Sequence, residues 1–261
     1  MKIIRVRPEL HLLLPSFGQV YVWTDGDALT LVDTGIATSP GEIAEALGRL
    51  GLRTGDVRTV VLTHFHEDHA GGAAEIATWG DVTVLAHRLE APVIRGEAPA
   101  PPPAFTEEER ELHRSLGAHL LPPAPPCGVD RELEDGDVVP FGGGARVISV
   151  PGHTDGGIAL HLPAHGVLFT GDVVAHVDGR VMPGVFNLDR EEVLRSFARL
   201  AEVEAGVACV GHGAPVENAR TALRAVAAEW SVHAPATAPP GRASADAEGG
   251  APRPEADTPE S

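Results

Sequence analysis

Three histidines and one aspartate occupy four of the six positions from His64 to His69. Imidazole nitrogens bind zinc or iron well, and a carboxylate adds a hard anionic ligand. On an extended backbone, His64 and His66 point to the same side. If the chain then turns into a helix, Asp68 and His69 can face the same space. This segment could therefore supply ligands to two neighbouring metal ions, and a solvated polar loop is the alternative interpretation.

Later residues of metal-binding type each follow an apolar run that predicts a β-strand. The carboxyl ends of strands are where the sites of α/β proteins gather. A lone histidine or aspartate after a strand has a simple explanation as a turn residue. Five histidines and two aspartates at successive strand ends, with glycine neighbours that let the backbone come close, favour a shared metal site. The predicted strands are 57–62, 145–150, 167–170 and 207–210, and the candidate ligands after them include His64, His153, Asp172 and His212.

The alternation of apolar runs and helical patterns predicts an α/β protein made of two similar halves that meet face to face. A helix is expected to start with Ser39 as its N-cap, Pro40 in its first turn and Glu42 closing a capping box. Another helix is expected over residues 70–79. Further strands are expected at 2–7, 19–23, 29–32 and 82–86, and residues 10–14 form an apolar run that Pro15 ends.

Two segments depart from this pattern. Residues 96–126 are rich in proline at both ends and contain a helical stretch that opens with a capping box at Thr106. We interpret them as an insertion that forms a lid beside the site, with a surface insertion as the alternative. Residues 233–261 are dominated by Pro, Ala, Gly, Ser and acidic residues, so we predict a disordered tail. The folded domain is expected to span residues 1–232.

The composition limits the classes of function. The chain has 261 residues and a formal net charge of −17, and an acidic surface repels the phosphates of nucleic acids. No apolar run approaches the length of about 18 residues that a membrane span needs, and the N-terminus lacks a signal-peptide pattern. Cys127 and Cys209 form no Cys-x-x-Cys motif, which fits ordinary thiols in a cytoplasmic protein. We expect a small-molecule substrate and no nucleic-acid or membrane partner, and we leave a homodimer open.

Five short motifs carry the candidate ligands or precede them. They are Asp-Thr-Gly at Asp33, His-x-His-x-Asp-His at 64–69, Pro-Gly-His-Thr at His153, Thr-Gly-Asp at Asp172 and Gly-His-Gly at His212. Their types and order resemble the metallo-β-lactamase superfamily across about residues 2–230. The resemblance implies the metallo-β-lactamase fold, a four-layer αββα sandwich with a two-metal site at one edge between the halves.

The resemblance also implies a ligand set. It assigns His64, His66 and His153 to the first metal ion, Asp68, His69 and His212 to the second, and Asp172 to a position bridging both. It further implies that Asp33 orients the ligand loop. Two divalent ions are expected, with zinc as the first choice and iron or manganese as alternatives.

The implied site predicts a hydrolase. Paired ions about 3.5–4 Å apart lower the pKa of bound water to about 7, so a bridging hydroxide would attack the substrate at neutral pH. Asp68 is the expected catalytic residue, which would orient this hydroxide and pass a proton to the leaving group. We therefore expect a dinuclear metal-dependent hydrolase of an ester, thioester or lactone, with a phosphodiester as an alternative substrate.

Departures from particular branches of the superfamily narrow this expectation. A bridging Asp172 is typical of glyoxalase II-like and lactonase-like members and is usually missing from antibiotic-hydrolysing ones. Lys2 is the single lysine and Tyr21 the single tyrosine, which argues against the glutathione site of glyoxalase II. Lactonases that open acyl-homoserine lactones often have tyrosine where this chain has Ala175. The insertion at 96–126 is far smaller than that of nucleic-acid-processing members.

Two alternatives belong to other functional classes. Persulfide dioxygenases resemble this superfamily and bind one iron at the positions of His64, His66 and His153, so a single iron and O₂ uptake would indicate an oxidoreductase. A non-catalytic member would act as a binding module. Such members usually lose ligands, whereas every ligand position is filled in this sequence.

Overall fold

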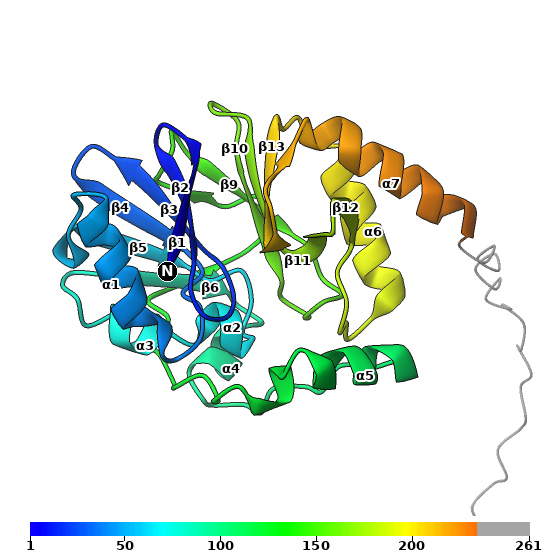
Figure 1. The fold of residues 1–261 in the computed structure, drawn as a ribbon, viewed down its shortest axis with the longest axis horizontal. Helices are drawn as coiled ribbons and strands as arrows, with labels where there is room; N and C mark the ends of the chain where they lie inside the picture. The colour runs from blue at the N-terminus through cyan, green and yellow to red at the C-terminus, as the bar shows by residue number, and fades with distance from the viewer. Residues whose placement is uncertain (234–261) are drawn as a thin grey trace, which may run out of the picture.

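The computed structural model describes residues 1–233 and arranges them in four layers (Figure 1). Two mixed β-sheets face each other at the centre, and helices cover the outer face of each sheet. This αββα sandwich is the fold predicted from the sequence. The predicted disordered tail lies outside the described residues, except for His233, which ends the last helix.

Within residues 1–233, the first sheet has seven strands in chain order. The first four pair antiparallel, whereas each pair from the fourth strand onward is parallel because a helical segment crosses between the strands. Parallel pairing brings the carboxyl ends of these strands to one edge of the sheet. The strands are β1 (Lys2–Arg7), β2 (Leu10–Leu14), β3 (Val20–Asp25), β4 (Ala28–Val32), β5 (Val57–Val61), β6 (Thr83–His87) and β7 (Arg131–Leu133).

The second sheet also has seven strands, with six in the order β14-β13-β11-β10-β9-β8 and β12 paired to β11. Its pairs are antiparallel except β11 and β13, which are parallel and joined by a helix. The strands are β8 (Val138–Val139), β9 (Ala145–Ser149), β10 (Ile158–Leu162), β11 (Val167–Val177), β12 (Arg180–Pro183), β13 (Val207–Gly213) and β14 (Val216–Glu217).

The helices lie in two outer layers and in the insertion between β6 and β7. None of those within residues 1–233 combines the length and the apolar character that a membrane span requires. The helices are α1 (Ser39–Arg49), α2 (Glu67–Ala70), α3 (Ala73–Ile76), α4 (Ala91–Ile94), α5 (Glu107–Ser115), α6 (Arg190–Ala201) and α7 (Ala219–His233), with short 3₁₀ turns η1 (Thr54–Asp56) and η2 (Ala118–Leu120).

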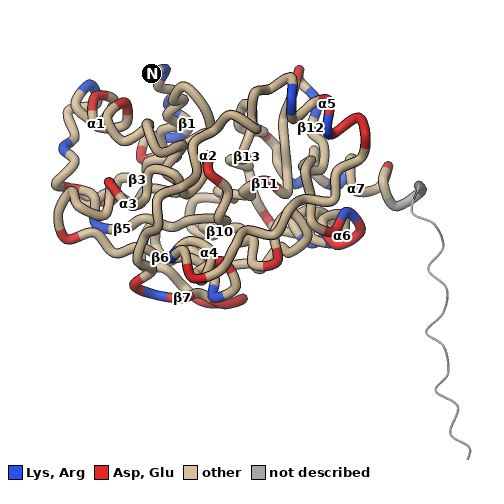
Figure 2. The backbone as a smooth tube through the Cα atoms, turned by 90° about the horizontal axis from the view of Figure 1, so that it is seen from below, with Lys and Arg blue, Asp and Glu red and all other residues tan. Residues whose placement is uncertain are grey.

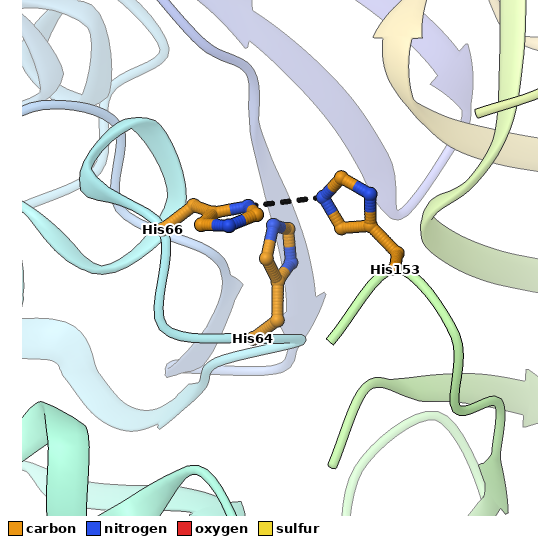
Figure 3. A group of neighbouring side chains, drawn as sticks. All are labelled: His64, His66 and His153. Carbon is orange, nitrogen blue, oxygen red and sulfur yellow. Dashed lines mark hydrogen bonds between the residues drawn. The ribbon is translucent and has the colours of Figure 1, made fainter. Parts of the chain in front are cut away.

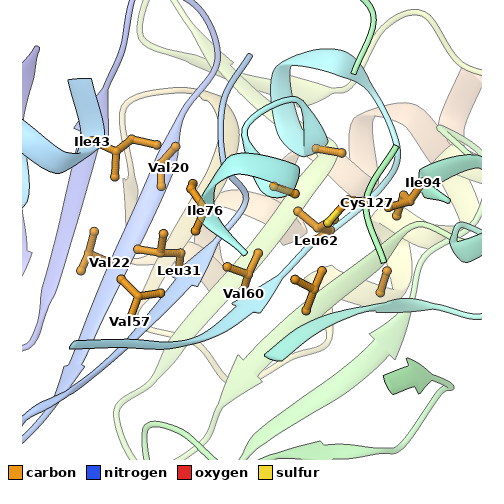
Figure 4. Packing of buried hydrophobic residues seen from close by; sticks show 14 of the residues in the cluster. Val20, Val22, Leu31, Ile43, Val57, Val60, Leu62, Ile76, Ile94 and Cys127 are labelled. Atoms are coloured by element: carbon orange, nitrogen blue, oxygen red, sulfur yellow. The ribbon is translucent and has the colours of Figure 1, made fainter. Parts of the chain in front are cut away.

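Among residues 1–233, three apolar clusters hold the layers together. One lies between the two sheets and includes Trp23 and Phe169. A second lies between the first sheet and its helices, where Ile43 and Ile76 pack onto the strands (Figure 4). The third lies between the second sheet and α6, which contributes Phe197. Burying one such side chain stabilises the fold by about 1.5–3 kcal/mol, so each layer is held firmly against the next.

The start of α1 differs from the prediction. Thr38 occupies the N-cap position, and no side-chain capping bond forms there. The Ser39 hydroxyl instead accepts a hydrogen bond from the backbone N–H of Ile36 (3.1 Å), and the Glu42 carboxylate accepts one from the hydroxyl of Ser16 (2.9 Å). The predicted capping box at this helix was wrong because both side chains bind the loops around the site rather than the helix terminus.

The helix predicted over residues 70–79 is interrupted, and two short helices, α2 and α3, take its place. The break falls at Gly71 and Gly72, where neighbouring backbone comes very close. A Cβ atom on Gly72 would lie 2.5 Å from the carbonyl oxygen of Thr34. The backbone N–H of Thr34 also donates to the carbonyl oxygen of His69 (2.7 Å). The glycine pair therefore lets the histidine-rich segment pack directly against the loop after β4.

The insertion runs along the lower edge of the sandwich in Figure 1, with α5 beneath α6. The capping box predicted at Thr106 is confirmed, because its hydroxyl accepts from the N–H of Glu109 (3.1 Å) and its N–H donates to the Glu109 carboxylate (2.8 Å). Glu109 also forms an ion pair with Arg190 at the start of α6 (2.5 Å). The backbone N–H of Ala104 donates to the carbonyl of Asn187 (2.9 Å). The insertion is thus fastened to the second half of the protein, and its role as a lid stays a prediction.

Candidate metal centre

The seven candidate ligands come from four parts of the chain and meet at one edge of the sandwich. Residues 64–69 follow β5 and start α2, His153 lies in the loop after β9, Asp172 lies on β11, and His212 lies on β13. Their nitrogen and oxygen atoms form three groups, and within each group these atoms lie within 4.8 Å of one another. The groups are His64, His66 and His153; His64, His69 and Asp172; and Asp68, His69 and His212.

The sequence predicted that Asp172 and His212 follow the ends of their strands. In the structure both residues lie inside their strands. β11 continues to Val177 and β13 continues to Gly213. The register of the β11–β13 pairing shifts on both sides of Gly171, which has a φ of +50°. Such a bulge redirects a side chain without ending the strand. The predicted strand ends were wrong because a bulge leaves no clear pattern in the sequence.

Gly211 provides the space for the carboxylate of Asp172. A Cβ atom at position 211 would overlap Asp172 Oδ1 and would lie 3.0 Å from the carbonyl carbon of Gly171. Such an overlap cannot form, so a larger residue must displace either the strand or the carboxylate. Glycine at this position is therefore part of the geometry of the site.

Gly211→Ala is expected to weaken metal binding by about 10–100-fold, the usual effect of disturbing what supports a ligand. Titration of the metal-free protein with zinc against a competing chelator measures this. Gly206→Ala is the matched control at the residue before β13, because the nearest atom to its Cβ is 3.6 Å away. Equal affinities in the two variants would show that Asp172 needs no such space.

His64, His66 and His153 form the first group of ligands (Figure 3). Their ring centroids lie 4.7 or 4.8 Å apart in each of the three pairs. His66 Nδ1 and His153 Nε2 lie 2.9 Å apart. Three imidazoles from two separate loops thus converge on one point.

Asp172 lies between this group and the second one. Its Oδ1 is 3.1 Å from His69 Nε2, and its Oδ2 is 3.1 Å from His212 Nε2 and 3.5 Å from His153 Nε2. Asp68 completes the second group, with Oδ2 3.2 Å from His212 Nε2 and 3.7 Å from His69 Nε2. One carboxylate therefore faces histidines of both groups.

The histidine rings are oriented by oxygen atoms behind them. His69 Nδ1 donates to Asp33 Oδ2 (2.8 Å), and His64 Nδ1 lies 3.0 Å from the Thr63 hydroxyl, which itself donates to Asp33 Oδ2 (2.8 Å). His153 Nδ1 lies 3.1 Å from Asn187 Oδ1. In each ring this contact leaves Nε2 to face the site, the arrangement typical of metal-binding histidines. Asp33 has a φ of +62°, a strained conformation held by these bonds.

Three polar atoms that face the site are buried and have no hydrogen-bond partner among the described residues. They are His64 Nε2, His69 Nε2 and Asp172 Oδ1. The last two approach to 3.1 Å but lack the angles of a hydrogen bond. Buried polar atoms without partners are costly, and nitrogen and carboxylate donors of this kind suit a divalent cation. The donor set therefore fits the metal ions that the sequence implied.

Burial sets the protonation of the first group. Removal from water lowers the pKa of His64 and of His153, and it lowers the pKa of His66 to about 3 with further help from His153. A charged imidazole is disfavoured in this crowded pocket. These three rings are therefore neutral near pH 7, which is the form that binds a metal.

The carboxylates have the opposite effect on the second group. Asp172 raises the pKa of His212 to about 10. Burial opposes a charge on His69, but Asp172 and Asp68 together raise its pKa. In the metal-free protein these two histidines are therefore protonated near pH 7 and pair with the ionised carboxylates. A cation binding there would displace protons, so its affinity is expected to rise with pH.

The candidate ligands all lie within a segment that matches a known protein family. Residues 13–212, well over half of the chain, match the family model described as the metallo-beta-lactamase superfamily. The chain belongs to the metallo-β-lactamase superfamily. The matched segment contains all seven candidate ligands, and the membership confirms the resemblance inferred from the motifs.

Relatives within the superfamily include proteins named as hydrolases. The chain is 31% identical over 242 residues to the probable metallo-hydrolase YflN of Bacillus subtilis, covering 84% of this chain and 89% of that one. It is 31% identical to the hydroxyacylglutathione hydrolase of Cereibacter sphaeroides, covering 80% of this chain and 68% of that one. The superfamily and these names make the chain a metallo-hydrolase in the broad sense.

Solved structures of the superfamily share the fold. A metallo-beta-lactamase family protein from Thermus thermophilus has a TM-score of 0.62 and 29% identity, covering 87% of this chain and 81% of that one. The Rm3 metallo-beta-lactamase has a TM-score of 0.66 at 20% identity, covering 89% and 91%. At that identity the second likeness concerns the fold alone.

Glu90 connects two of the ligand loops in this superfamily member. Its carboxylate, in a residue only 1% exposed, accepts hydrogen bonds from the N–H of Phe65 (2.8 Å) and the N–H of Gly156 (2.7 Å). Phe65 lies between two candidate ligands, and Gly156 follows His153 by three positions. Burial raises the pKa of Glu90 to about 7. The sequence analysis missed this residue, because a single glutamate before a short helix shows no motif.

Glu90→Gln is expected to lower the free energy of unfolding by about 1–3 kcal/mol at pH 5, because an amide nitrogen cannot accept one of the two N–H bonds. The pKa of Glu90 rises from 4.5 unfolded to about 7 folded, so its stabilisation is full below pH 4.5 and is lost as the pH rises through about 7. The difference in the free energy of unfolding between the unaltered protein and Glu90→Gln should therefore become smaller between pH 5 and pH 8. Chemical denaturation of metal-free protein at several pH values measures it.

The matched control for this prediction is Glu97→Gln, at an exposed glutamate seven positions later. It should change the stability by less than about 0.5 kcal/mol at every pH. A deficit for Glu90→Gln that stays constant from pH 5 to pH 8 would contradict the assigned protonation of Glu90.

Gln19 and Asn187 are two further supports that the sequence did not reveal. Gln19 donates from Nε2 to the carbonyl of Val210 (3.0 Å) and accepts from the N–H of Gly213 (2.7 Å), so it holds the strand on both sides of His212. Asn187 Nδ2 donates to the carbonyl of Gly184 (2.8 Å) while its Oδ1 faces His153. Side-chain amides of this kind become recognisable only when distant segments are placed together.

Proposed function

We propose that this protein is a dinuclear metal-dependent hydrolase of an ester, thioester or lactone bond in a small molecule of the cytoplasm. The observation that carries the proposal is the position of Asp172, whose two oxygens each lie 3.1 Å from a histidine nitrogen and whose Oδ2 also lies 3.5 Å from His153. A carboxylate shared by two ligand groups is what a pair of cations needs. Zinc suits the nitrogen-rich donors, with iron or manganese as alternatives.

Divalent cations held here would lower the pKa of the attacking water and polarise the oxygen of the substrate. Asp68 lines a cavity that opens beside the metal centre, and its Oδ2 lies 3.2 Å from His212 Nε2. Burial opposes its ionisation, but His69 and His212 hold the pKa of Asp68 at about 2. Asp68 is therefore ionised, and we assign to it the orientation of the attacking water and the transfer of its proton to the leaving group.

Acyl bonds are the substrates that the relatives and the charges support. A hydroxyacylglutathione hydrolase, by its name, hydrolyses a hydroxyacyl derivative of glutathione, and this chain is 31% identical to one over 212 residues. A phosphodiester carries a negative charge, which the net charge of −17 disfavours. Esters, thioesters and lactones are therefore the first substrates to test.

The test uses the full chain, stripped of metal by chelation and reloaded with zinc, manganese or iron. A panel of an aryl ester, an acyl thioester, a lactone, a phosphodiester and a β-lactam is assayed for hydrolysis. The proposal expects metal-dependent cleavage of at least one of the three acyl substrates. Cleavage of the phosphodiester alone, or no hydrolysis together with O₂ uptake by an iron-loaded protein, would overturn it.

A further inference from the structure

A cavity of about 810 Å³ extends from the metal centre to the insertion. At one end it is lined by ligands, among them Asp68 and His212, and at the other by the proline-rich arm and the helix of the insertion. The loop that carries Phe17 forms another wall. Cavities of this size bind small molecules and bury most of their surface. A substrate whose reacting bond lies at the metal centre would thus extend its remaining part towards the insertion.

An aromatic cluster joins the insertion to the second half of the protein at this cavity. The Phe105 and Phe186 rings have centroids 5.6 Å apart, and His113 lies 5.0 Å from the first and 5.2 Å from the second. All three line the cavity. Phe186 has a φ of +63°, which is strained for a residue other than glycine. Backbone strain that places an aromatic ring in a cavity wall points to a binding role for this wall.

The insertion also exposes leucines on one helical face. Leu112 is 39% exposed and Leu116 is 52% exposed, and both line the cavity. They lie four residues apart, so they are neighbours on the helix surface. Leu120 is 75% exposed but lies outside the cavity lining. Apolar side chains left open to a cavity favour an apolar ligand.

The charge of the lining away from the metal centre disfavours an anionic ligand. Among the described residues that line the cavity, none is lysine or arginine, while Glu67, Asp68 and Asp172 are acidic. The acidic segment of α2 is visible in red in Figure 2. Beyond the metal centre the lining offers an anionic group the carboxylate of Glu67, apolar walls and the imidazoles of His113 and His119, but no basic side chain to balance its charge. An uncharged group meets no such penalty.

We propose that the substrate is an ester, thioester or lactone with an uncharged, apolar acyl chain that lies against Phe105, Phe186 and Leu116. This inference rests on the proposed function, because hydrolysis at the metal centre defines where the acyl carbon lies. Hydrolysis adds water across the acyl bond and releases the carboxylic acid and the alcohol or thiol. The apolar wall then selects the chain, and the lack of basic residues selects against acyl groups that end in a carboxylate.

The first measurement is a chain-length series with the metal-loaded full chain. p-Nitrophenyl esters from acetyl to decanoyl are compared with esters of similar length whose acyl chain ends in a carboxylate. The value of kcat/KM is expected to rise by up to about fourfold for each added methylene until the cavity is filled. The carboxylate-ended esters are expected to be poorer by at least about tenfold at equal length.

Variants at two leucines locate the wall. Leu116→Asp is expected to reduce kcat/KM for the decanoyl ester at least about tenfold more than for the acetyl ester, because a carboxylate then faces the chain. Leu120→Asp is the matched control, since Leu120 lies in the same insertion but outside the lining. It should keep the chain-length series of the unaltered protein.

A binding assay separates this inference from the proposed function. Uncleaved N-methyl alkanamides of four to ten carbons are titrated into the same proteins by calorimetry. Binding that strengthens with chain length and weakens in Leu116→Asp would support the apolar wall even if no ester is cleaved. Ester cleavage or amide binding without a dependence on chain length would overturn the inference while the proposed function stands. The inference is also overturned if Leu116→Asp converts a dimer to a monomer and leaves the dependence of kcat/KM on chain length unchanged. Leu116 would then belong to an interface between two copies of the chain rather than to the cavity wall.

Discussion

Replacing Asp172 by asparagine is expected to reduce the bound metal from about two ions per chain to about one, and to lower kcat/KM by more than about 100-fold. Loss of a residue that merely supports a ligand costs about 10–100-fold, and Asp172 is itself shared by both ligand groups. Its Oδ1 faces His69 and its Oδ2 faces His212 and His153, so the neutral amide removes charge from both groups at once.

Elemental analysis of the purified variant, followed by kinetics on the best acyl substrate, measures both effects. Asp178→Asn is the matched control, because Asp178 lies six positions later in an exposed turn with a φ of +51° that asparagine tolerates. It should keep its metal and its activity within about threefold of the parent, as surface substitutions usually do. Full metal content in Asp172→Asn would show that this carboxylate bridges nothing.

Replacing Asp68 by asparagine is expected to lower kcat/KM by about 10²–10⁴-fold at saturating metal, the usual contribution of a positioned general base or acid. The loss should fall mainly on kcat, because Asp68 is assigned to the transfer of a proton rather than to holding the acyl chain. Asparagine keeps the shape of the side chain but cannot accept that proton. The first ligand group of three histidines remains complete in this variant, so part of the metal is retained.

Steady-state kinetics over a range of zinc concentrations separates lost metal from lost chemistry. Asp155→Asn serves as the control, since Asp155 is an exposed carboxylate in the same loop as His153. It should stay within about threefold of the parent protein. If Asp68→Asn regains full activity when zinc is raised, Asp68 acts as a ligand only and the proposed proton transfer is wrong.

The sequence predicted the α/β class from local patterns, and the resemblance carried by its motifs implied the four-layer sandwich and the ligand set. Apolar runs interrupted by helical patterns indicate an α/β protein. Within the segment 64–69, spacing alone places His64 and His66 on one side of the chain, and their ring centroids are indeed 4.7 Å apart. Motif order then supplied the three later ligands, which the structure brings to the same edge.

Other features depend on contacts between distant segments, and no local pattern reports them. The bulge at Gly171 keeps Asp172 inside β11, where a strand end had been expected. Gly71 and Gly72 break the predicted helix because the backbone after β4 packs against them. Glu90 binds two loops that lie far apart in sequence, at Phe65 and Gly156. Their roles become visible only in three dimensions.

Metal stoichiometry of the unaltered chain tests the central claim most directly. Native mass spectrometry after chelation and reloading with excess zinc counts the ions bound to each folded chain. A shared Asp172 between two histidine groups predicts about two ions bound per chain, with both lost only under strong chelation. Binding that stops at one ion per chain under excess zinc, or a single iron that supports O₂ uptake, would contradict the dinuclear hydrolase.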